Sequence, residues 1–111
     1  MVNYMDGEVL RSVMKSRLRV AILEYLWNKH PEKSYLSEIM RGIRSDFSNT
    51  HGALNGSKRW TLELSLVSLK LLKRVEIKKN TYYLLNDDKI QDIQDILNLV
   101  NNTTTLEVIV E

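Results

Sequence analysis

Apolar residues recur at steps of three and four over several stretches of the chain, which is the spacing of amphipathic helices. Between residues 8 and 30 they cover two sides of one predicted helix, which ends before Pro31 because proline cannot continue it. Ser16 is a candidate N-cap that would divide a short leading helix from the main one. A helix with so wide an apolar surface is either central to a core or shared between a core and a partner.

Two shorter helices are predicted next, over 37–44 and roughly over 48–56. The first is expected to begin at Ser37 as its N-cap and to bury a stripe made of Leu36, Ile39, Met40 and Ile43. The second is expected to have Ser45 or Ser48 as its N-cap and Gly56 as a left-handed C-cap. Its helix propensity is weak, so packing must hold it through its expected core contacts, Phe47, Ala53 and Leu54.

The stretch 61–73 fits two patterns. Leu62, Leu64 and Leu66 alternate as in a strand, but leucines also recur at helical steps, and the length and leucine content favour a helix. Strand chemistry follows, and residues 75–77 and 82–85 predict a β-hairpin. Asn80 is the turn residue expected to tolerate a positive φ best.

The C-terminal part predicts a helix over 87–100, capped by Asn86 or Asp87. Asparagine and threonine at 101–105 are expected to end it, leaving a tail over 101–111 with a short β-prone run at 106–110. The 111 residues therefore predict one domain, in which an N-terminal helix over 8–30 precedes the main unit over 34–86. The order of elements is that of a winged helix-turn-helix, a mainly α fold with a small β-hairpin wing (α+β).

Composition excludes several classes of protein. The chain has no cysteine, so neither disulfides nor thiolate metal sites can form. No apolar run reaches the ~20 residues of a membrane span, and residues 1–7 lack the apolar core of a secretory signal. We therefore expect a cytoplasmic protein without a membrane partner. The two histidines are far apart in the predicted fold and no phosphate-binding glycine loop is present, so we expect neither an enzyme nor a bound cofactor or metal.

Positive charge is concentrated in the middle of the chain. Residues 32–79 contain ten Lys or Arg and five acidic residues, whereas residues 80–111 contain one Lys and six acidic residues. This asymmetry is expected when one surface faces phosphates and another does not. The alternative is a solvated surface on which charges cluster by chance.

The segment over 48–56 is suited to the major groove of DNA. Its short hydroxyl, amide and imidazole side chains match base edges or phosphates, and basic residues beside it and at the hairpin tip match phosphates. The predicted DNA-binding residues are Arg41, Arg44, Ser48, Asn49, Thr50, His51, Asn55, Lys58, Arg59, Lys78 and Lys79. The rival recognition helix, 61–73, ranks second because leucines occupy most of its surface.

Five segments in this order resemble archaeal winged-helix transcription regulators, broadly the ArsR-like group: RVAILEYLW from residue 19, YLSEI from 35, HGALNG from 51, LSLVSL from 64 and NTYYLL from 80. The resemblance covers about residues 17–86. It implies that the helix near 48–56 enters DNA, that the hairpin is the wing, and that terminal helices form a homodimer. The metal-sensing cysteines of some members are absent, so metal regulation is not implied.

The expected dimer interface consists of apolar residues of the two terminal helices, Leu10, Val13, Met14, Ile90, Ile93, Leu97 and Val100. The sequence thus predicts a homodimeric, sequence-specific regulator of transcription that binds double-stranded DNA. The same apolar surfaces motivate the alternative, a winged-helix module that serves protein–protein assembly without binding DNA.

Overall fold

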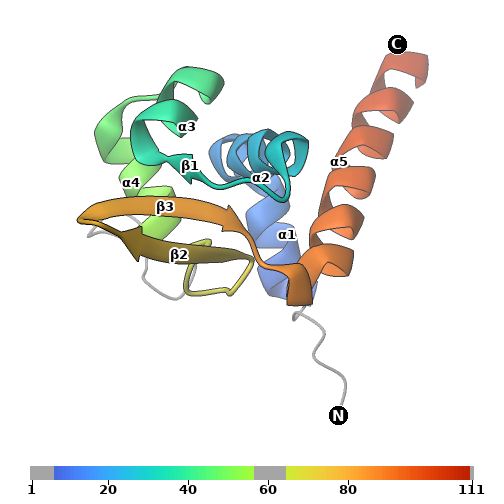
Figure 1. The fold of residues 1–111 in the computed structure, drawn as a ribbon. Coiled ribbons are helices and arrows are strands. Elements are labelled where there is room, and N and C mark those ends of the chain that lie inside the picture. The colour runs from blue at the N-terminus through green and yellow to red at the C-terminus, as the bar shows by residue number, and fades with distance from the viewer. Residues whose placement is uncertain (1–6, 57–64, 111) are drawn as a thin grey trace.

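The computed structural model describes residues 7–56 and 65–110, with side-chain surroundings at 11–56 and 65–101. Within these residues, five α-helices pack with a three-stranded antiparallel sheet in an α+β fold (Figure 1). This order is compatible with a winged-helix layout. In chain order the elements are α1 (Gly7–Lys15), α2 (Arg17–Lys29), β1 (Ser34–Tyr35), α3 (Leu36–Ile43), α4 (Phe47–Asn55), β2 (Leu72–Ile77), β3 (Asn80–Leu85), the 3-10 helix η2 (Asp87–Lys89) and α5 (Ile90–Val110).

The helix predicted over 8–30 is two helices, α1 and α2, divided at Ser16. The Ser16 hydroxyl caps α2 by accepting a hydrogen bond from the backbone N–H of Arg19 (3.2 Å). α2 is central to the fold, because Ile22, Leu23 and Leu26 are fully buried. They belong to one cluster with buried residues from the rest of the described chain, among them Ile39, Leu54, Leu71, Leu85, Ile93 and Ile96. The wide apolar surface of α2 therefore serves the core of its own chain.

The cap predicted for α3 is wrong by two residues. Tyr35, not Ser37, is the N-cap, and the Glu38 carboxylate accepts a hydrogen bond from the Tyr35 backbone N–H (2.8 Å). The Glu38 carboxylate in the first turn thus satisfies the backbone N–H of the N-cap residue, as the glutamate of a capping box does.

The cap predicted for α4 is also wrong. Asp46 caps this helix instead of Ser45 or Ser48, because its Oδ1 accepts a hydrogen bond from the Asn49 backbone N–H (2.8 Å). Gly56 ends α4 with a positive φ of 92°, as a glycine C-cap predicts. Its ψ of 156° differs from the left-handed helical conformation that the sequence led us to expect.

The sheet has the order β1-β3-β2, and its hairpin confirms the prediction, with Val75 opposite Tyr82. The turn is at a different place than expected, because Lys78 and Lys79 have positive φ (50° and 69°) and Asn80 already begins β3. A two-residue hairpin turn of type I′ has positive φ at both central residues, which matches the twist of the strands. The pairing of Ile77 with Asn80 leaves the two lysines as the central residues of such a turn.

The helix predicted over 61–73 is wrong where the structure describes it. Residues 57–64 lie outside the described part, residues 65–71 form turns, and β2 begins at Leu72. The backbone N–H groups of Leu66 and Val67 donate to the carbonyls of Ala53 and Leu54 (2.9 and 3.0 Å), so the segment satisfies the C-terminal end of α4. A positive φ of 63° at Lys70 then precedes β2.

The last helix is longer than predicted. Asn86 caps η2 by accepting a hydrogen bond from the Asp88 N–H (3.1 Å), and α5 then continues without a break from Ile90 to Val110. The expected stop at 101–105 and the expected β-prone tail are therefore wrong. Asparagine and threonine each cost less than about 0.7 kcal/mol in a helix, whereas a helix end is usually marked by glycine or proline. Neither of these occurs after residue 56.

Candidate nucleic-acid interface

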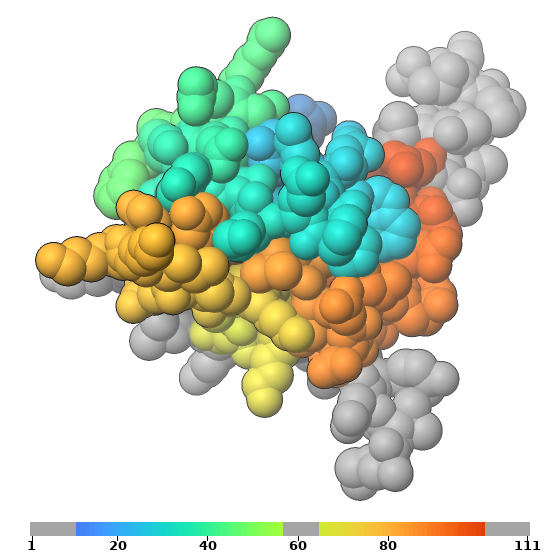
Figure 2. Space-filling model, in the orientation of Figure 1, coloured from blue at the N-terminus to red at the C-terminus, as the bar shows by residue number. Residues whose placement is uncertain are grey.

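The helix predicted to enter DNA, α4, and the predicted wing lie on the same side of the molecule. Figure 1 shows α4 and the turn between β2 and β3 at one side, with α5 at the other. In the space-filling view the β2–β3 turn projects from the body below the green surface of α3 and α4 (Figure 2). This arrangement gives a surface that contains both elements.

α4 has a buried side and an open side. Thr50, Ala53 and Leu54 are fully buried, whereas Phe47 and Ser48 are exposed and Asn49 and His51 are half-buried. We call these last four residues the open side of α4. The prediction that Thr50 contacts DNA is wrong, because Thr50 has no accessible surface. Its position three residues before Ala53 and four before Leu54 places it on the core side of the helix.

Asn55 is also turned toward the protein. Its side-chain Nδ2 donates a 2.8 Å hydrogen bond to the hydroxyl of the buried Tyr83 in β3. This bond connects the C-terminal end of α4 to the sheet and occupies a donor that a base edge would need. The structure therefore shows a positioning contact for Asn55, and its contact with DNA stays a prediction.

Phe47 is not the core contact that the sequence led us to expect. It is 58% exposed at the first position of α4, and its ring stacks on His51 one turn later (centroids 5.4 Å apart, planes at 28°). An apolar residue beside a core-facing segment is expected in the core, but the helix turns Phe47 outward. The signal that could have shown otherwise is the four-residue step to His51, which places the two rings in contact along one line of the helix.

Asn49 is partly committed to the cap of its own helix. Its backbone N–H and its Nδ2 donate to the two carboxylate oxygens of Asp46 (2.8 and 3.0 Å). Asp46 therefore holds negative charge at the N-terminal end of α4, where a bare helix terminus would attract a phosphate. The phosphate contacts predicted for this surface must come from other residues.

Four of the predicted cations are exposed and available for phosphate. Arg41 is in the last turn of α3, Arg44 is its C-cap in the left-handed conformation (φ 56°, ψ 49°), and Lys78 and Lys79 form the wing turn. None of these four forms an ion pair with another described residue. Lys58 and Arg59 lie outside the described residues.

Not every basic residue serves a surface. Arg19 in α2 is 3% exposed, and burial lowers the pKa of its guanidinium from the ordinary value. An arginine remains charged even then. Arg19 is therefore part of the interior of the fold and contributes little to the charge that an approaching phosphate meets.

The prediction of a dimer interface is wrong for three residues, because a single chain already buries them. Val13, Ile93 and Leu97 belong to the core cluster. Met14, Ile90 and Val100 are half-buried against the same cluster, and the surroundings of Leu10 lie outside the described side chains. The burial of Ile93 and Leu97 follows from the packing of α5 beside α2, which the sequence did not reveal.

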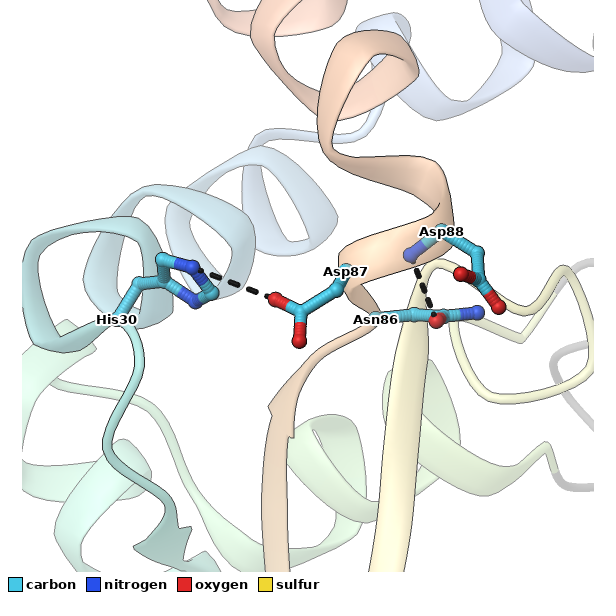
Figure 3. Close-up of polar contacts among 4 residues, drawn as sticks. All are labelled: His30, Asn86, Asp87 and Asp88. Atoms are coloured by element: carbon cyan, nitrogen blue, oxygen red, sulfur yellow. Dashed lines mark hydrogen bonds and ion pairs between the residues drawn. The ribbon is translucent and has the colours of Figure 1, made fainter.

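The end of α2 meets η2, the short helix before α5, through a polar contact (Figure 3). His30 Nε2 lies 3.4 Å from Asp87 Oδ1, and the neighbouring Asn86 donates through Nδ2 to the carbonyl of Lys70 (2.7 Å). These contacts join the end of β3 to α2 and to the turns before β2. No group of three metal-ligating side chains occurs in the described part of the chain.

A tyrosine pair lies on the sheet where β1 and β3 meet. The hydroxyls of Tyr35 and Tyr82 are hydrogen-bonded (2.9 Å), their ring centroids are 4.5 Å apart, and Lys33 Nζ lies 5.1 Å from the Tyr82 centroid. The hydrogen bond with Tyr82 raises the pKa of Tyr35, with the nearby Tyr82 and Glu38 charges acting in the same direction. The pair joins the short β1 strand to β3 next to the start of α3.

A groove of about 450 Å³ runs between α2 and α5, on the side away from the wing. Its lining is mainly polar and includes Glu24, Asn28, Gln94 and Asn98 beside Trp27.

No helix among the described residues has the length and apolarity to cross a bilayer.

Comparison with known proteins places the chain in a family. The sequence model of the EarA-like family matches residues 9–101, which include the whole candidate interface. An uncharacterised protein of Methanocaldococcus jannaschii is 41% identical over 85 residues, or 76% of this chain and 77% of the relative. No solved structure matches the chain. The chain therefore belongs to the EarA-like family.

Proposed function

We propose that the protein is a sequence-specific transcription regulator that binds double-stranded DNA, with α4 in the major groove and the β2–β3 turn as the wing. One observation carries the proposal: α4 and the turn between β2 and β3 lie at the same side of the molecule in Figure 1, away from α5. Arg41, Arg44, Lys78 and Lys79 provide positive charge around them that no described acid neutralises. Phosphate contacts from such residues fix position, and contacts from the helix to base edges give sequence preference.

The division of labour within this surface follows from the side chains. The four cations take the phosphates on either side of the groove, since the Asp46 carboxylate makes the start of α4 unsuitable for an anion. Ser48, Asn49 and His51 face the bases with short donors and acceptors. The hydrogen bond between Asn55 and Tyr83 holds the orientation of α4 relative to the sheet.

The resemblance to archaeal winged-helix regulators of the ArsR-like group supports the same role and adds a homodimer. Two reading helices related by a two-fold axis would contact two half-sites, so the target is a pair of inverted repeats. A protein that acts on the genome in this way works in the cytoplasm.

The proposal is tested with the full chain and a random duplex library, by sequencing the retained duplexes and measuring their affinity by fluorescence anisotropy. We expect log affinity to fall linearly with log salt, with a slope of about −0.9 for each neutralised phosphate. Purified protein that ignores every duplex at about 50 mM salt would refute the proposal.

Charge-reversed variants locate the surface. Arg41→Glu and Lys79→Glu should weaken binding to all sequences alike, because phosphate contacts carry no sequence information. Lys29→Glu is the matched control, since Lys29 ends α2 next to His30, which contacts Asp87 in η2 away from the wing. Equal losses of affinity in all three variants would show that net charge alone matters and that DNA does not bind at this surface.

A second candidate function is protein–protein assembly without DNA. The observation that favours it is a pair of separate exposed apolar side chains, Leu99 on α5 and Ile77 on the wing, which are 48% and 41% exposed. An assembly module would form its complex regardless of salt, and it would be unaffected by Arg41→Glu.

A further inference from the structure

The side chain of Phe47 is the most exposed large hydrophobic group of the described residues, at 58%. Burying such a ring against a partner lowers the free energy, whereas leaving it exposed to water in the free protein contributes no stability. Phe47 is the first residue of α4 and closely follows Arg41 and Arg44 of α3 along the chain, and α4 lies at the same side of Figure 1 as the β2–β3 turn of Lys78 and Lys79. The positive charge of this surface indicates that the partner that covers the ring is polyanionic.

The ring is held in place before any partner arrives. It stacks on His51 at 5.4 Å with a tilt of 28°, and the residue before it, Asp46, is fixed as the N-cap by two hydrogen bonds to Asn49. A side chain supported in this way loses little freedom on binding, so the contact it makes is selective and has a small entropic penalty.

The chemistry of the duplex limits what Phe47 can touch. Phosphate is excluded, because the ring offers no donor and the adjacent Asp46 carboxylate repels anions. In the major groove the edges of bases are polar except at one group, the C5-methyl of thymine. An apolar side chain at the start of a helix in that groove therefore has this methyl group as its complement.

We infer that Phe47 is a specificity-determining residue that packs on the C5-methyl group of thymine, supported by His51. The inference rests on the proposed DNA-binding function and specifies which base edge α4 prefers. It adds a role for an apolar residue that the polar composition of the segment did not predict. His51 acts through Phe47 as a positioning residue.

The test compares thymine with uracil, which differ only by this methyl group. The duplexes that the full chain retains from the random library are prepared twice, once with thymine and once with deoxyuridine throughout. The wild type should bind the thymine duplexes about fourfold more tightly for each methyl group contacted. Phe47→Ala should bind both forms equally, and Ser48→Ala, the adjacent open-side control, should keep the preference for thymine. Circular dichroism confirms that both variants keep the helical content of the wild type.

The outcomes separate this inference from the function on which it rests. A wild type that binds both forms equally well overturns the role of Phe47 and leaves DNA binding in place. A preference for thymine that persists in Phe47→Ala overturns it too, because another residue then reads the methyl group. A wild type that binds neither form refutes the proposed function together with the inference.

Discussion

At the scale of single residues, Gly42 shows how one missing side chain sets the packing of α3 on α2. A Cβ at this position would clash with atoms Cε1 and Cδ1 of the Tyr25 ring. The absence of a side chain therefore lets the ring of Tyr25 lie directly against the backbone of α3. The helix gives up about 1 kcal/mol of propensity relative to alanine for this close approach.

We predict that Gly42→Ala destabilises the protein by about 1–3 kcal/mol, because the ring must leave its site or α3 must move. Urea denaturation of the wild type and the variant measures the difference. In a Tyr25→Ala background the same substitution should be neutral or stabilising, since the obstacle is gone and alanine favours the helix. Equal effects in both backgrounds would contradict the steric argument.

The tyrosine pair on the sheet gives a second prediction at this scale, on pH. The pKa of Tyr35 is raised in the folded state, chiefly by its hydrogen bond with Tyr82. A group with a raised folded pKa stabilises the fold below its unfolded pKa, which is about 10 for tyrosine, and this contribution is lost as the pH rises through the folded pKa. Tyr82→Phe should therefore move the Tyr35 titration, followed by tyrosinate absorbance, to lower pH. Tyr83→Phe should leave the Tyr35 titration unchanged, because it keeps the Tyr35–Tyr82 bond.

At the scale of elements, the wing combines strain with charge. Lys78 and Lys79 both have positive φ, and a non-glycine residue in the left-handed region costs about 1–2 kcal/mol. Asparagine and glycine are the residues that favour such a two-residue turn. Strained conformations concentrate at functional sites. A function for the two lysine charges, such as contact with phosphate, therefore accounts for lysines at these positions.

We predict that replacing Lys78 and Lys79 by Asn and Gly stabilises the fold by about 1–2 kcal/mol and weakens binding to every duplex. The slope of log affinity against log salt should become shallower by about 0.9 for each phosphate that the turn no longer neutralises. The control replaces both lysines by Gln, which removes the same charge and keeps the strained turn. It should weaken binding to the same extent without any gain in the midpoint of urea denaturation. Retained affinity in the Asn-Gly variant would show that the wing does not touch DNA.

Elements with a regular apolar spacing could be predicted from the sequence, and elements decided by tertiary contacts could not. The stripe from Leu36 to Ile43 and the alternation around Val75 gave α3 and the hairpin. The leucines near Leu66 fit a helix equally well by spacing, but hydrogen bonds to Ala53 and Leu54 hold them in turns. Within the candidate site, residue type alone did not reveal that Thr50 and Asn55 face the protein, since the same polar groups suit a base edge or an internal bond.

At the scale of the whole molecule, the position of α5 decides which residues remain for a partner. α5 packs beside α2, and its Ile93 and Ile96 complete the core. Figure 1 shows the helix at the side opposite to the wing, so contacts between two copies through α5 would leave both reading surfaces open. A homodimer of this kind would use the remaining open apolar surface, which includes Leu99.

We predict that Leu99→Asp converts the proposed dimer into monomers. In a two-fold dimer each substitution is present twice, so two leucine side chains lose their burial and the dimer dissociation constant should rise about a hundredfold or more. Light scattering across a range of protein concentrations measures the change, and circular dichroism confirms that the variant stays folded. Asn98→Asp is the matched control, because it adds the same charge at the adjacent exposed position without removing apolar surface. If Leu99→Asp remained dimeric, the interface would lie elsewhere, and a wild type that is monomeric at all concentrations would exclude the dimer altogether.

Where the variant is monomeric, its binding to a single half-site should persist. The gain in affinity from an inverted repeat should disappear, because only a dimer can occupy both half-sites at once.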